Sequence, residues 1–464
     1  MGIQNTSVLK KQKAEYLPRG RNTLHQVFEH HFTDFCDRYE DEYADKFGKF
    51  RLERIQAVGE HFLTCGDYRQ GIARIRCSNP DCGYDYFRPF SCKGFYLCPS
   101  CSQKRTLLFA EHINEEVLLH LPHRQFVFTF PKALRVFFRH DRKLFAEISK
   151  MIFAMISDFY RAVAGIEIDT GMVIAHQTFG DMLRWNPHFH AILLEGGFDE
   201  DGTFVYLPFS GLEKMTEYFR RTVLRFFSER KLLSEQFSRN MLSWKHSGFS
   251  IDNSVRILDE SSRDSLAQYM ARPPISLKKI HYEGFKGRVL FHTHYNEYFK
   301  ENVHMPDACP GRSRRLRPGF KACDFLAELT QHIPPKGVQL IRRYGLYSSR
   351  IKGAWESMPH VAERAPTGWK MQHNSQMGTS NPEDFEPFAN TDFSEDSPDA
   401  RDYKKAWARL LSKVYEIDPM VCPKCGSEMK VIAIIQEPDE IKRILRHLVK
   451  QERPPPGFDP ASLN

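Results

Sequence analysis

The chain has 464 residues, enough for about three domains, and its 41% apolar content supports buried cores. No stretch approaches the length and hydrophobicity of a membrane span and no apolar signal segment opens the chain, so we expect a cytoplasmic protein with no membrane partner. The formal net charge is +8 at pH 7; because residues 373–403 carry a net −7, the remainder carries +8 − (−7) = +15, which suits a polyanionic partner.

The predicted elements begin with a polar helical segment over the first sixty residues, followed by a cysteine-rich stretch at 61–104. Short β-type runs then alternate with stretches whose apolar residues recur at helical spacing. Residues 370–400 are rich in Ser, Asn, Pro, Asp and Glu and predict a flexible linker before a small C-terminal unit. The remaining predictions, in chain order, are a strand at 126–130, a helix at 141–164, strands at 171–179 and 188–194, and helices at 212–232 and 261–271.

Most of the eleven cysteines stand in closely spaced pairs, which indicates metal binding in a reducing compartment rather than a disulfide framework. The pairs Cys77-x4-Cys82 and Cys98-x2-Cys101 lie fifteen residues apart, within the usual spacing of a four-cysteine zinc site. Two tight turns can each present two thiolates to a tetrahedral ion. We therefore predict one Zn²⁺ site from these four cysteines, structural because its ligand set is closed.

Six other cysteines have no clear assignment from spacing alone. Cys65 and Cys92 are spare ligands, a second half-site or buried thiols, and buried thiols are the default. Cys422-x2-Cys425 forms another knuckle without a local partner pair. Cys309 and Cys323 complete it only if the fold brings them close.

A possible active site centres on the sequence Asn186-Pro187-His188-Phe189-His190, which opens a predicted strand. Successive side chains of a strand alternate faces, so His188 and His190 point the same way. Such a pair is half of a divalent-metal site, although an isolated His-x-His is more often a pair of ordinary histidines. A second example, His292-Thr293-His294, has a polar centre and no comparable apolar run.

The preceding strand offers a third ligand. If the two strands form an antiparallel hairpin, residues near 177 lie opposite those near 190, so His176 or Gln177 can reach the metal. By bare chemistry His176 is the better ligand, whereas the carbonyl oxygen of Gln177 suits Mg²⁺ or Mn²⁺. Adjacent residues face opposite ways, so only one of the two can serve.

The candidate nucleophile is Tyr269, late in the predicted helix at 261–271, with Arg272 close behind it. Taken alone, one tyrosine among eighteen is more simply a packing residue. A tyrosine can, however, attack a phosphodiester and retain it as a phosphotyrosine, with a metal and Arg272 stabilising the phosphate charge. Such transesterification needs no nucleotide hydrolysis, and the chain has no Gly-Lys-Ser/Thr phosphate-binding loop.

In this order the motifs resemble the rolling-circle insertion-sequence transposases. The resemblance to that family's N-terminal zinc-binding domain is carried by Cys65-Gly66, Cys77, Cys82, Phe90-Ser91-Cys92-Lys93 and Cys98-Pro99-Ser100-Cys101. Its histidine and tyrosine motifs are matched by Gln177-Thr178-Phe179-Gly180, Asn186-Pro187-His188-Phe189-His190, Leu266-Ala267-Gln268-Tyr269 and Arg272-Pro273-Pro274. Further similar segments are His332-Ile333-Pro334, Arg343-Tyr344-Gly345-Leu346-Tyr347 and Cys422-Pro423-Lys424-Cys425-Gly426.

The resemblance implies a bacterial α+β transposase with an HUH endonuclease core, in which an antiparallel sheet carries the histidines and a helix carries the tyrosine. It implies nicking of one DNA strand, with the 5′ end kept on the tyrosine and a 3′-OH released. It also favours Gln177 over His176 as third ligand, because position 177 is eleven residues before His188. Relatives with two catalytic tyrosines space them four apart, but residue 265 here is Ser265, which favours a single nucleophile.

The expected partners are single-stranded DNA and transposon ends, with host replication machinery or a helicase as further candidates; the oligomeric state is open. The alternatives are a replication initiator or relaxase-type nickase, and a non-catalytic zinc DNA-binding regulator.

The sequence predicts six units. The first three are an N-terminal helical segment at 1–60, a zinc-binding domain at 61–120 and an HUH core at 121–305. They are followed by a basic and aromatic DNA-contacting extension at 306–369 that includes the arginines of 312–317, an acidic linker at 370–403 and a C-terminal helical and Cys-x-x-Cys unit at 404–464.

Overall fold

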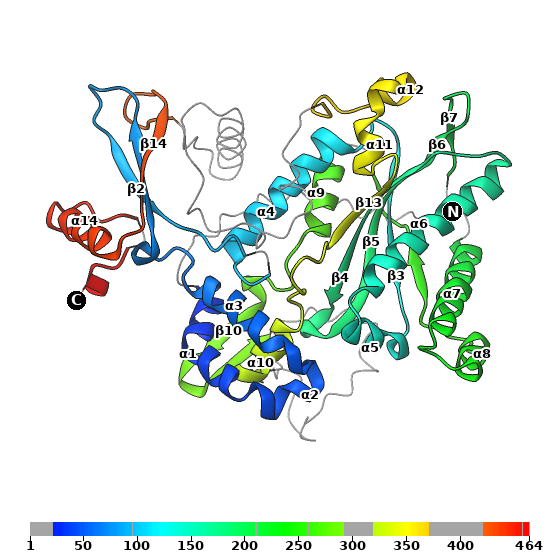
Figure 1. Ribbon diagram of the computed structural model, residues 1–464, viewed down its shortest axis with the longest axis horizontal. Coiled ribbons are helices and arrows are strands. Elements are labelled where there is room, and N and C mark those ends of the chain that lie inside the picture. Colours follow the sequence, from blue (N-terminus) through cyan, green and yellow to red (C-terminus); the bar gives the residue numbers. More distant parts are fainter. Residues whose placement is uncertain are drawn as a thin grey trace, which may run out of the picture.

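The computed structural model describes residues 22–94, 96–208, 212–257, 260–291, 319–370, 421–456 and 458–463. Within these ranges a large body surrounds an antiparallel sheet, and a smaller lobe containing β2, β14 and α14 stands to one side (Figure 1). Helix α4 runs between them (Figure 1). The predicted acidic linker, the motif His292-Thr293-His294, the arginine-rich segment 312–317 and Cys309 lie outside the described residues.

The sheet of the body has the strand order β13-β4-β5-β3-β8, and β9 also pairs with β3. Every one of these pairings is antiparallel. The predicted hairpin between residues 171–179 and 188–194 is confirmed as β4 and β5. The strands are β3 (His123–Thr129), β4 (Gly171–Phe179), β5 (Trp185–Leu194), β8 (Ser250–Asp252), β9 (Arg256–Ile257) and β13 (Ile341–Gly345).

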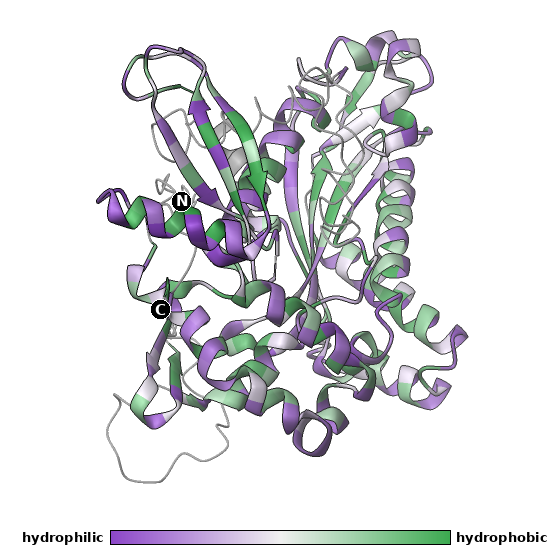
Figure 2. Cartoon of the chain, turned by 60° about the vertical axis from the view of Figure 1, so that its left-hand side comes forward, coloured by the Kyte–Doolittle hydropathy of each residue, from purple (hydrophilic) through white to green (hydrophobic). Residues whose placement is uncertain are grey.

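Strand alternation gives the sheet two buried faces. One face carries Phe126, Phe128 and Phe189 and packs on a layer of helices, α5 (Lys132–His140), α6 (Leu144–Ala164), α7 (Leu212–Glu229) and α8 (Glu235–Ser243). The other face carries Val173, Ala175 and Ile192 and is covered by α4 (Pro99–His112), α9 (Glu260–Met270), α11 (Ser349–Gly353) and α12 (Pro359–Ala362). Apolar strands therefore lie between helices with hydrophilic outer surfaces (Figure 2).

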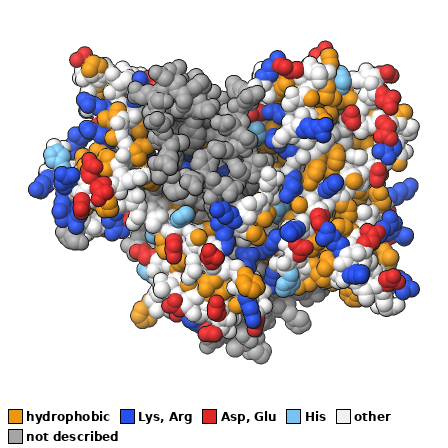
Figure 3. Space-filling model, in the orientation of Figure 1, with side chains coloured by type: hydrophobic (Ala, Val, Ile, Leu, Met, Phe, Trp, Pro, Cys, Tyr) orange, Lys and Arg blue, Asp and Glu red, His pale blue; other side chains and the backbone are white. Residues whose placement is uncertain are grey.

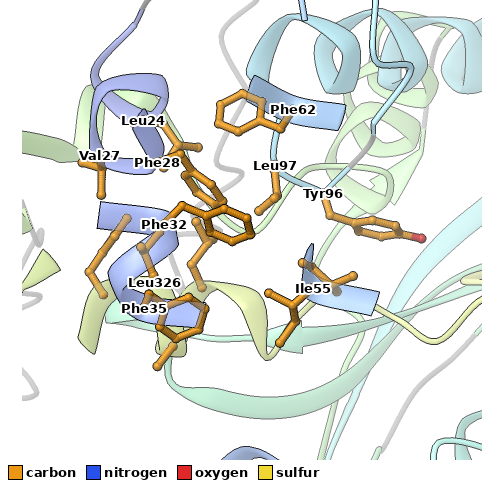
Figure 4. Close-up of a cluster of buried hydrophobic side chains, with 14 of the residues drawn as sticks. Leu24, Val27, Phe28, Phe32, Phe35, Ile55, Phe62, Tyr96, Leu97 and Leu326 are labelled. Atoms are coloured by element: carbon orange, nitrogen blue, oxygen red, sulfur yellow. The ribbon is translucent and has the colours of Figure 1, made fainter. Parts of the chain in front are cut away.

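The N-terminal helices do not stand alone. Their aromatic side chains share one core with the later segment that leads to Ile333, as the close-up in Figure 4 shows for Phe28, Phe32 and Leu326. Gly59 lets helix α3 approach Phe32, because a Cβ at this position would lie 2.2 Å from that ring. The elements are α1 (Thr23–Asp37), α2 (Ala44–Phe47), α3 (Leu52–Leu63), β10 (Ile280–Glu283), β11 (Arg288–Phe291), β12 (Gly319–Lys321) and α10 (Ala322–Thr330).

The small lobe combines a segment from the N-terminal part of the chain with one from the C-terminal part. Its sheet has the order β14-β1-β2, so the C-terminal strand pairs with a strand near the N-terminus. Its elements are β1 (Ile72–Cys77), β2 (Asp85–Pro89), β14 (Met429–Ile435) and α14 (Pro438–Lys450); the body also has a small hairpin of β6 (Gly196–Phe198) and β7 (Phe204–Tyr206). None of the described helices is both long and apolar enough to cross a membrane.

Candidate active site

Strands β4 and β5 bring three of the predicted site residues onto one face of the sheet. Gln177 pairs with His188 across the hairpin, and His190 follows two residues later on the same face. The two imidazole rings lie 4.8 Å apart, centroid to centroid. His176 points to the opposite face, where it stacks on Phe145 at 4.1 Å. Of the two candidate third ligands, only Gln177 therefore shares a face with the histidines.

His188 is held in the form that a metal ion requires. Its Nδ1–H donates to the carbonyl oxygen of Asn186 at 2.7 Å, which leaves the lone pair on Nε2. Burial lowers its pKa to about 4, and the charges of Arg272 and Arg135 act in the same direction. At neutral pH the imidazole is therefore uncharged, as a ligand must be.

His190 has an unusual environment for a buried ring. Its Nε2 atom is buried and has no hydrogen-bond partner among the described residues. Its Nδ1 lies 3.3 Å from the side-chain amide of Gln125 on β3. The amide nitrogen of Gln125 faces Nδ1, an arrangement in which Gln125 donates and the ring proton lies on Nε2. Turning the amide over presents its oxygen to Nδ1–H and leaves the Nε2 lone pair free. Burial, followed by the charges of His188 and Arg272, lowers the pKa of His190 well below its usual value.

Sequence reasoning missed Gln125. The predicted strand began at residue 126, whereas β3 begins at His123. Gln125 pairs with Ile192, two positions beyond His190, on a strand that is distant in the sequence, so only the β3–β5 register reveals its contact with His190.

Gln177 links the sheet to the helix that carries the tyrosine. Its Nε2 donates to the carbonyl oxygens of Tyr269 and Met270, at 3.1 and 3.2 Å. Its Oε1 is buried and has no partner among the described residues. An unpaired buried acceptor costs about 1–3 kcal/mol. Two such orphaned atoms on one face, an imidazole nitrogen and an amide oxygen, form a donor set that fits a small divalent cation.

Helix α9 places Tyr269 and Arg272 beside these side chains. The Tyr269 ring lies 5.0 Å from that of His190 and nearly perpendicular to it, while 38% of the residue stays exposed. The Arg272 guanidinium lies 4.0 Å from the Tyr269 ring centroid. Its Nε is buried without a partner among the described residues, and burial lowers its pKa. All five residues predicted for the active site thus meet in one place.

A cavity opens next to this group, at the end of β4 that β13 does not cover. Its lining includes Gln177, Arg272, Arg142 and His332. Two arginines in the wall give the cavity a positive lining, which suits an anionic group such as a phosphodiester.

The structure corrects the predicted zinc ligands. Cys98 and Cys101 lie with Cys65 and Cys92, and not with the other predicted pair. The Cys65 sulfur is 3.5 Å from that of Cys98 and 3.7 Å from that of Cys101, and the Cys92 and Cys101 sulfurs are also 3.7 Å apart. Cys98 is the N-cap residue of α4, Cys101 lies in the first turn of that helix, and Cys65 follows the end of α3.

The other predicted pair, Cys77 and Cys82, lies with Cys422 and Cys425. The prediction was wrong in its grouping because Cys77 ends β1, whose partner strand β14 is far away in the sequence. Local spacing cannot report such a pairing. Cys323, offered above as a partner of the C-terminal knuckle, instead donates its thiol to Asp34 at 3.1 Å.

Comparison with known proteins gives two family matches. Residues 32–130 match the family described as a transposase zinc-binding domain, and residues 171–354 match one described as a putative transposase. The first range holds the Cys65, Cys92, Cys98 and Cys101 cluster, and the second holds the histidines, Gln177 and Tyr269.

Two curated relatives are similar over much of the chain. The transposase for insertion sequence element IS801 of Pseudomonas savastanoi pv. phaseolicola is 24% identical over 403 residues, which cover 84% of this chain and 85% of the relative. The putative transposase y4qJ of Sinorhizobium fredii is 23% identical over 324 residues, 65% of this chain and 73% of the relative. No solved structure matches the chain.

Proposed function

Because the chain belongs to the rolling-circle insertion-sequence transposases with an N-terminal zinc-binding domain, we propose that it nicks and rejoins single-stranded DNA through a 5′-phosphotyrosine link on Tyr269. One observation supports this most strongly. An exposed tyrosine lies against His190, on the sheet face where two buried acceptor atoms lack partners among the described residues.

His188, His190 and Gln177 would hold a Mg²⁺ or Mn²⁺ ion through two imidazole nitrogens and an amide oxygen. The orphaned Nε2 of His190 and Oε1 of Gln177 support this assignment. Bound there, the ion would polarise a non-bridging oxygen of the scissile phosphate.

In the cleavage step the Tyr269 hydroxyl oxygen attacks phosphorus, and the bond from phosphorus to the 3′ oxygen breaks. The phenol loses its proton, the leaving 3′ oxygen gains one, and the 5′ phosphate remains esterified to the tyrosine. Arg272, stacked against the ring, places a positive charge beside the reacting phosphate. Attack by another 3′-OH reverses the step, so rejoining needs no nucleotide cofactor.

Ser265 bears on the order of these steps. It stands one helical turn before Tyr269 on α9, where a second tyrosine would lie on the same side of the helix. With serine there, each active site holds one covalent link at a time. Cleavage and rejoining would alternate on Tyr269 or involve a second subunit.

The cluster of Cys65, Cys92, Cys98 and Cys101 would hold a structural zinc ion. All four sulfurs lie within 4.8 Å of one another, which fits a tetrahedral thiolate site. An ion there ties the end of α3 to the start of α4, the helix that packs against α9.

The partner would be DNA at the transposon ends. Lys and Arg side chains are spread over the small lobe and the body on the face shown in Figure 3. The exposed cations of α14 are Lys442, Arg443, Arg446 and Lys450. Such surfaces suit contact with a phosphate backbone.

The test is to incubate the purified protein with Mn²⁺ and a single-stranded oligonucleotide that carries the element's end. We expect a covalent protein–DNA adduct. Tyr269→Phe should abolish the adduct but retain DNA binding, because it removes only the attacking oxygen. Ser265→Ala, one turn away on the same helix, should leave the adduct intact.

An adduct from Tyr269→Phe would exclude this nucleophile. Failure of the wild-type protein to form any adduct with element ends, while it still binds them, would favour a zinc-dependent DNA-binding regulator. Cleavage of a plasmid origin in preference to element ends would favour a replication initiator or relaxase.

A further inference from the structure

The small lobe contains a second group of four cysteines. Cys77 and Cys82 come from the N-terminal part of the chain, and Cys422 and Cys425 come from the C-terminal part. The family match to a zinc-binding domain covers residues 32–130 and therefore contains only half of this group. Nothing in the proposed DNA chemistry uses it.

The two pairs sit on turns of the same design. In each, a glycine with positive φ directly follows the second cysteine: Gly83 at +62° and Gly426 at +74°. Backbone hydrogen bonds close both turns, from Cys82 N to Asn79 O at 3.2 Å and from Gly426 N to Cys422 O at 2.9 Å. Such cysteine turns present two thiolates toward one point, as zinc knuckles do.

The fold brings the two turns face to face. Strand β1 ends at Cys77 and pairs with β14 from Ile72–Ile435 to Cys77–Met429. The amide of Ser78 donates to Glu428 O at 2.8 Å, and the Lys424 ammonium lies 5.4 Å from the Tyr84 ring centroid. The turns thus meet although Cys77 and Cys425 are 348 residues apart.

The sulfur spacing suits a tetrahedral metal ion. Cys77 and Cys425 sulfurs are 3.4 Å apart, Cys82 and Cys422 sulfurs are 3.6 Å apart, and all four lie within 4.8 Å of one another. With zinc–sulfur bonds of about 2.3 Å, the sulfurs of a regular tetrahedron are about 3.8 Å apart. A disulfide needs about 2.05 Å, and all four cysteines are free thiols.

The apolar core next to the cysteines is small. Apart from Cys77 and Cys422 themselves, its buried members are only Ile75 and Met429, with Tyr84 and Tyr86 partly buried. The larger apolar cluster of the lobe, which includes Ile72, Ile435 and Leu445, lies at the other end of the β1–β14 pair. Near the cysteines the apolar packing is therefore small, and Val431 and Ile432 of β14 are exposed. Small units of this kind depend on a metal or a covalent link.

We propose that Cys77, Cys82, Cys422 and Cys425 bind a second structural Zn²⁺, which fastens the C-terminal strand and helix to the N-terminal domain. The lobe is then a zinc ribbon assembled from two distant segments. This site is independent of the Cys65, Cys92, Cys98 and Cys101 cluster and of the proposed reaction.

The first test counts zinc in the purified full-length protein by elemental mass spectrometry. We expect two zinc ions per chain, one for each cluster. Cys425→Ser should remove one, Cys98→Ser should remove the other, and the double variant should hold none. Cys36→Ser is the matched control, since this buried cysteine belongs to neither cluster and should leave both ions.

One zinc ion in the zinc-saturated wild-type protein would overturn the proposal, as would two ions remaining in Cys425→Ser. A disulfide at either pair would appear as the loss of two titratable thiols together with a single zinc. Because Cys425 is exposed, its replacement does not open a buried core, so a failure to fold is not expected to obscure the count.

The second test measures hydrogen–deuterium exchange of the same variants. In Cys425→Ser the amides of β1 and β14 should exchange roughly tenfold faster or more, because opening of the lobe no longer requires loss of the metal. The amides of α9 should be unchanged. If Cys425→Ser loses zinc but the amides of β14 do not exchange faster, the ion binds at this site without holding β14 to β1.

Discussion

Gln177 makes two kinds of contact at the candidate site. Its amide nitrogen donates to two carbonyl oxygens at the end of α9, while its amide oxygen is directed away from them without a partner among the described residues. A histidine or carboxylate could supply a metal ligand here, but neither offers two N–H donors from one group. The amide therefore couples the position of the ligand to the position of the tyrosine.

Gln177→Glu separates these roles. A carboxylate remains a good ligand for Mn²⁺ but lacks the N–H groups and faces two carbonyl oxygens. We expect Mn²⁺ binding, measured by titration calorimetry, to persist while the rate of adduct formation falls roughly 10- to 100-fold. Gln177→Ala should lose both properties. An unchanged rate in Gln177→Glu would show that the contacts with α9 do not position Tyr269.

The meeting of these residues was predictable because it depends on one short hairpin. Strand alternation put His188 and His190 on one face, and the short connection placed residues near 177 opposite them. The choice of Gln177 over His176 came from the family resemblance and not from the hairpin. Gln125 and Arg142 were not predictable. Both reach the site from segments whose place in the fold is set by long-range packing.

At the scale of elements, the contact between α4 and α9 connects the N-terminal cysteine cluster to the helix that carries Tyr269. The Thr106 hydroxyl on α4 donates to the carbonyl oxygen of Ala271, just after α9, at 2.9 Å. Both residues are buried. The cysteine cluster at the start of α4 is thereby connected, through this helix and its hydrogen bond, to the end of the helix that carries Tyr269.

Thr106→Val keeps the shape of the side chain but removes the donor. The buried Ala271 carbonyl then lacks this partner, which should lower the free energy of unfolding by about 1–3 kcal/mol. The rate of adduct formation should fall as well, because the end of α9 is less firmly held. Thr106→Ser retains the hydroxyl and should behave like the wild type in both urea unfolding and the adduct assay. If Val and Ser variants are equally active, this hydrogen bond does not position the helix.

Some helices and strands could be predicted from the sequence more accurately than others. The helices predicted at 141–164, 212–232 and 261–271 are observed as α6, α7 and α9 with nearly the same bounds. Helix α5 was missed because it is short: its nine residues directly follow Pro131, and its buried stripe consists only of Leu134 and Phe138, one turn apart. The sheet order was also beyond prediction, since the pairing of β13 with β4 joins strands separated by a long stretch of chain.

At the scale of the whole molecule, His332 connects the N-terminal core to the β4–β5 hairpin. Its Nδ1 accepts from the Thr178 hydroxyl and its Nε2–H donates to Leu183 O, both at 2.9 Å. Leu183 lies in the β4–β5 connection with a positive φ of 57°. Burial lowers the pKa of His332 to about 3, and the charges of Arg142, Arg51 and Arg139 act in the same direction.

This depressed pKa predicts acid sensitivity. The neutral ring contributes its full stability above the unfolded-state pKa of about 6.5, and the contribution is lost as pH falls toward the folded-state value. At pH 5 the unfolded chain binds the proton and the folded chain does not, which costs about 2 kcal/mol from this residue.

Urea unfolding followed by tryptophan fluorescence at pH 7.5 and pH 5 tests this expectation. His332→Gln can still donate to Leu183 and accept from Thr178, but it does not titrate. It should be less stable at pH 7.5 and should lose about 2 kcal/mol less than the wild type on acidification. An identical loss in both proteins would assign the acid sensitivity to other residues.

The division of the chain into units was the least predictable level. The first sixty residues were expected as a separate segment, but their aromatic side chains form one core with residues around α10. The C-terminal unit was likewise expected to stand apart, whereas β14 completes the sheet of β1 and β2. In both cases local composition indicates what kind of segment is present, but the elements that the segment packs against are set by long-range contacts.

The pairing of β1 with β14 also sets the order in which the molecule can be completed during synthesis. Cys77 leaves the ribosome 348 residues before Cys425. At synthesis rates of about 5–20 residues per second, that interval lasts roughly 20 to 70 s. Until then β1 has no partner on its outer edge, and the small lobe is open. A chain that ends between α9 and β14 would therefore carry the histidine hairpin and Tyr269 but could not close the small lobe.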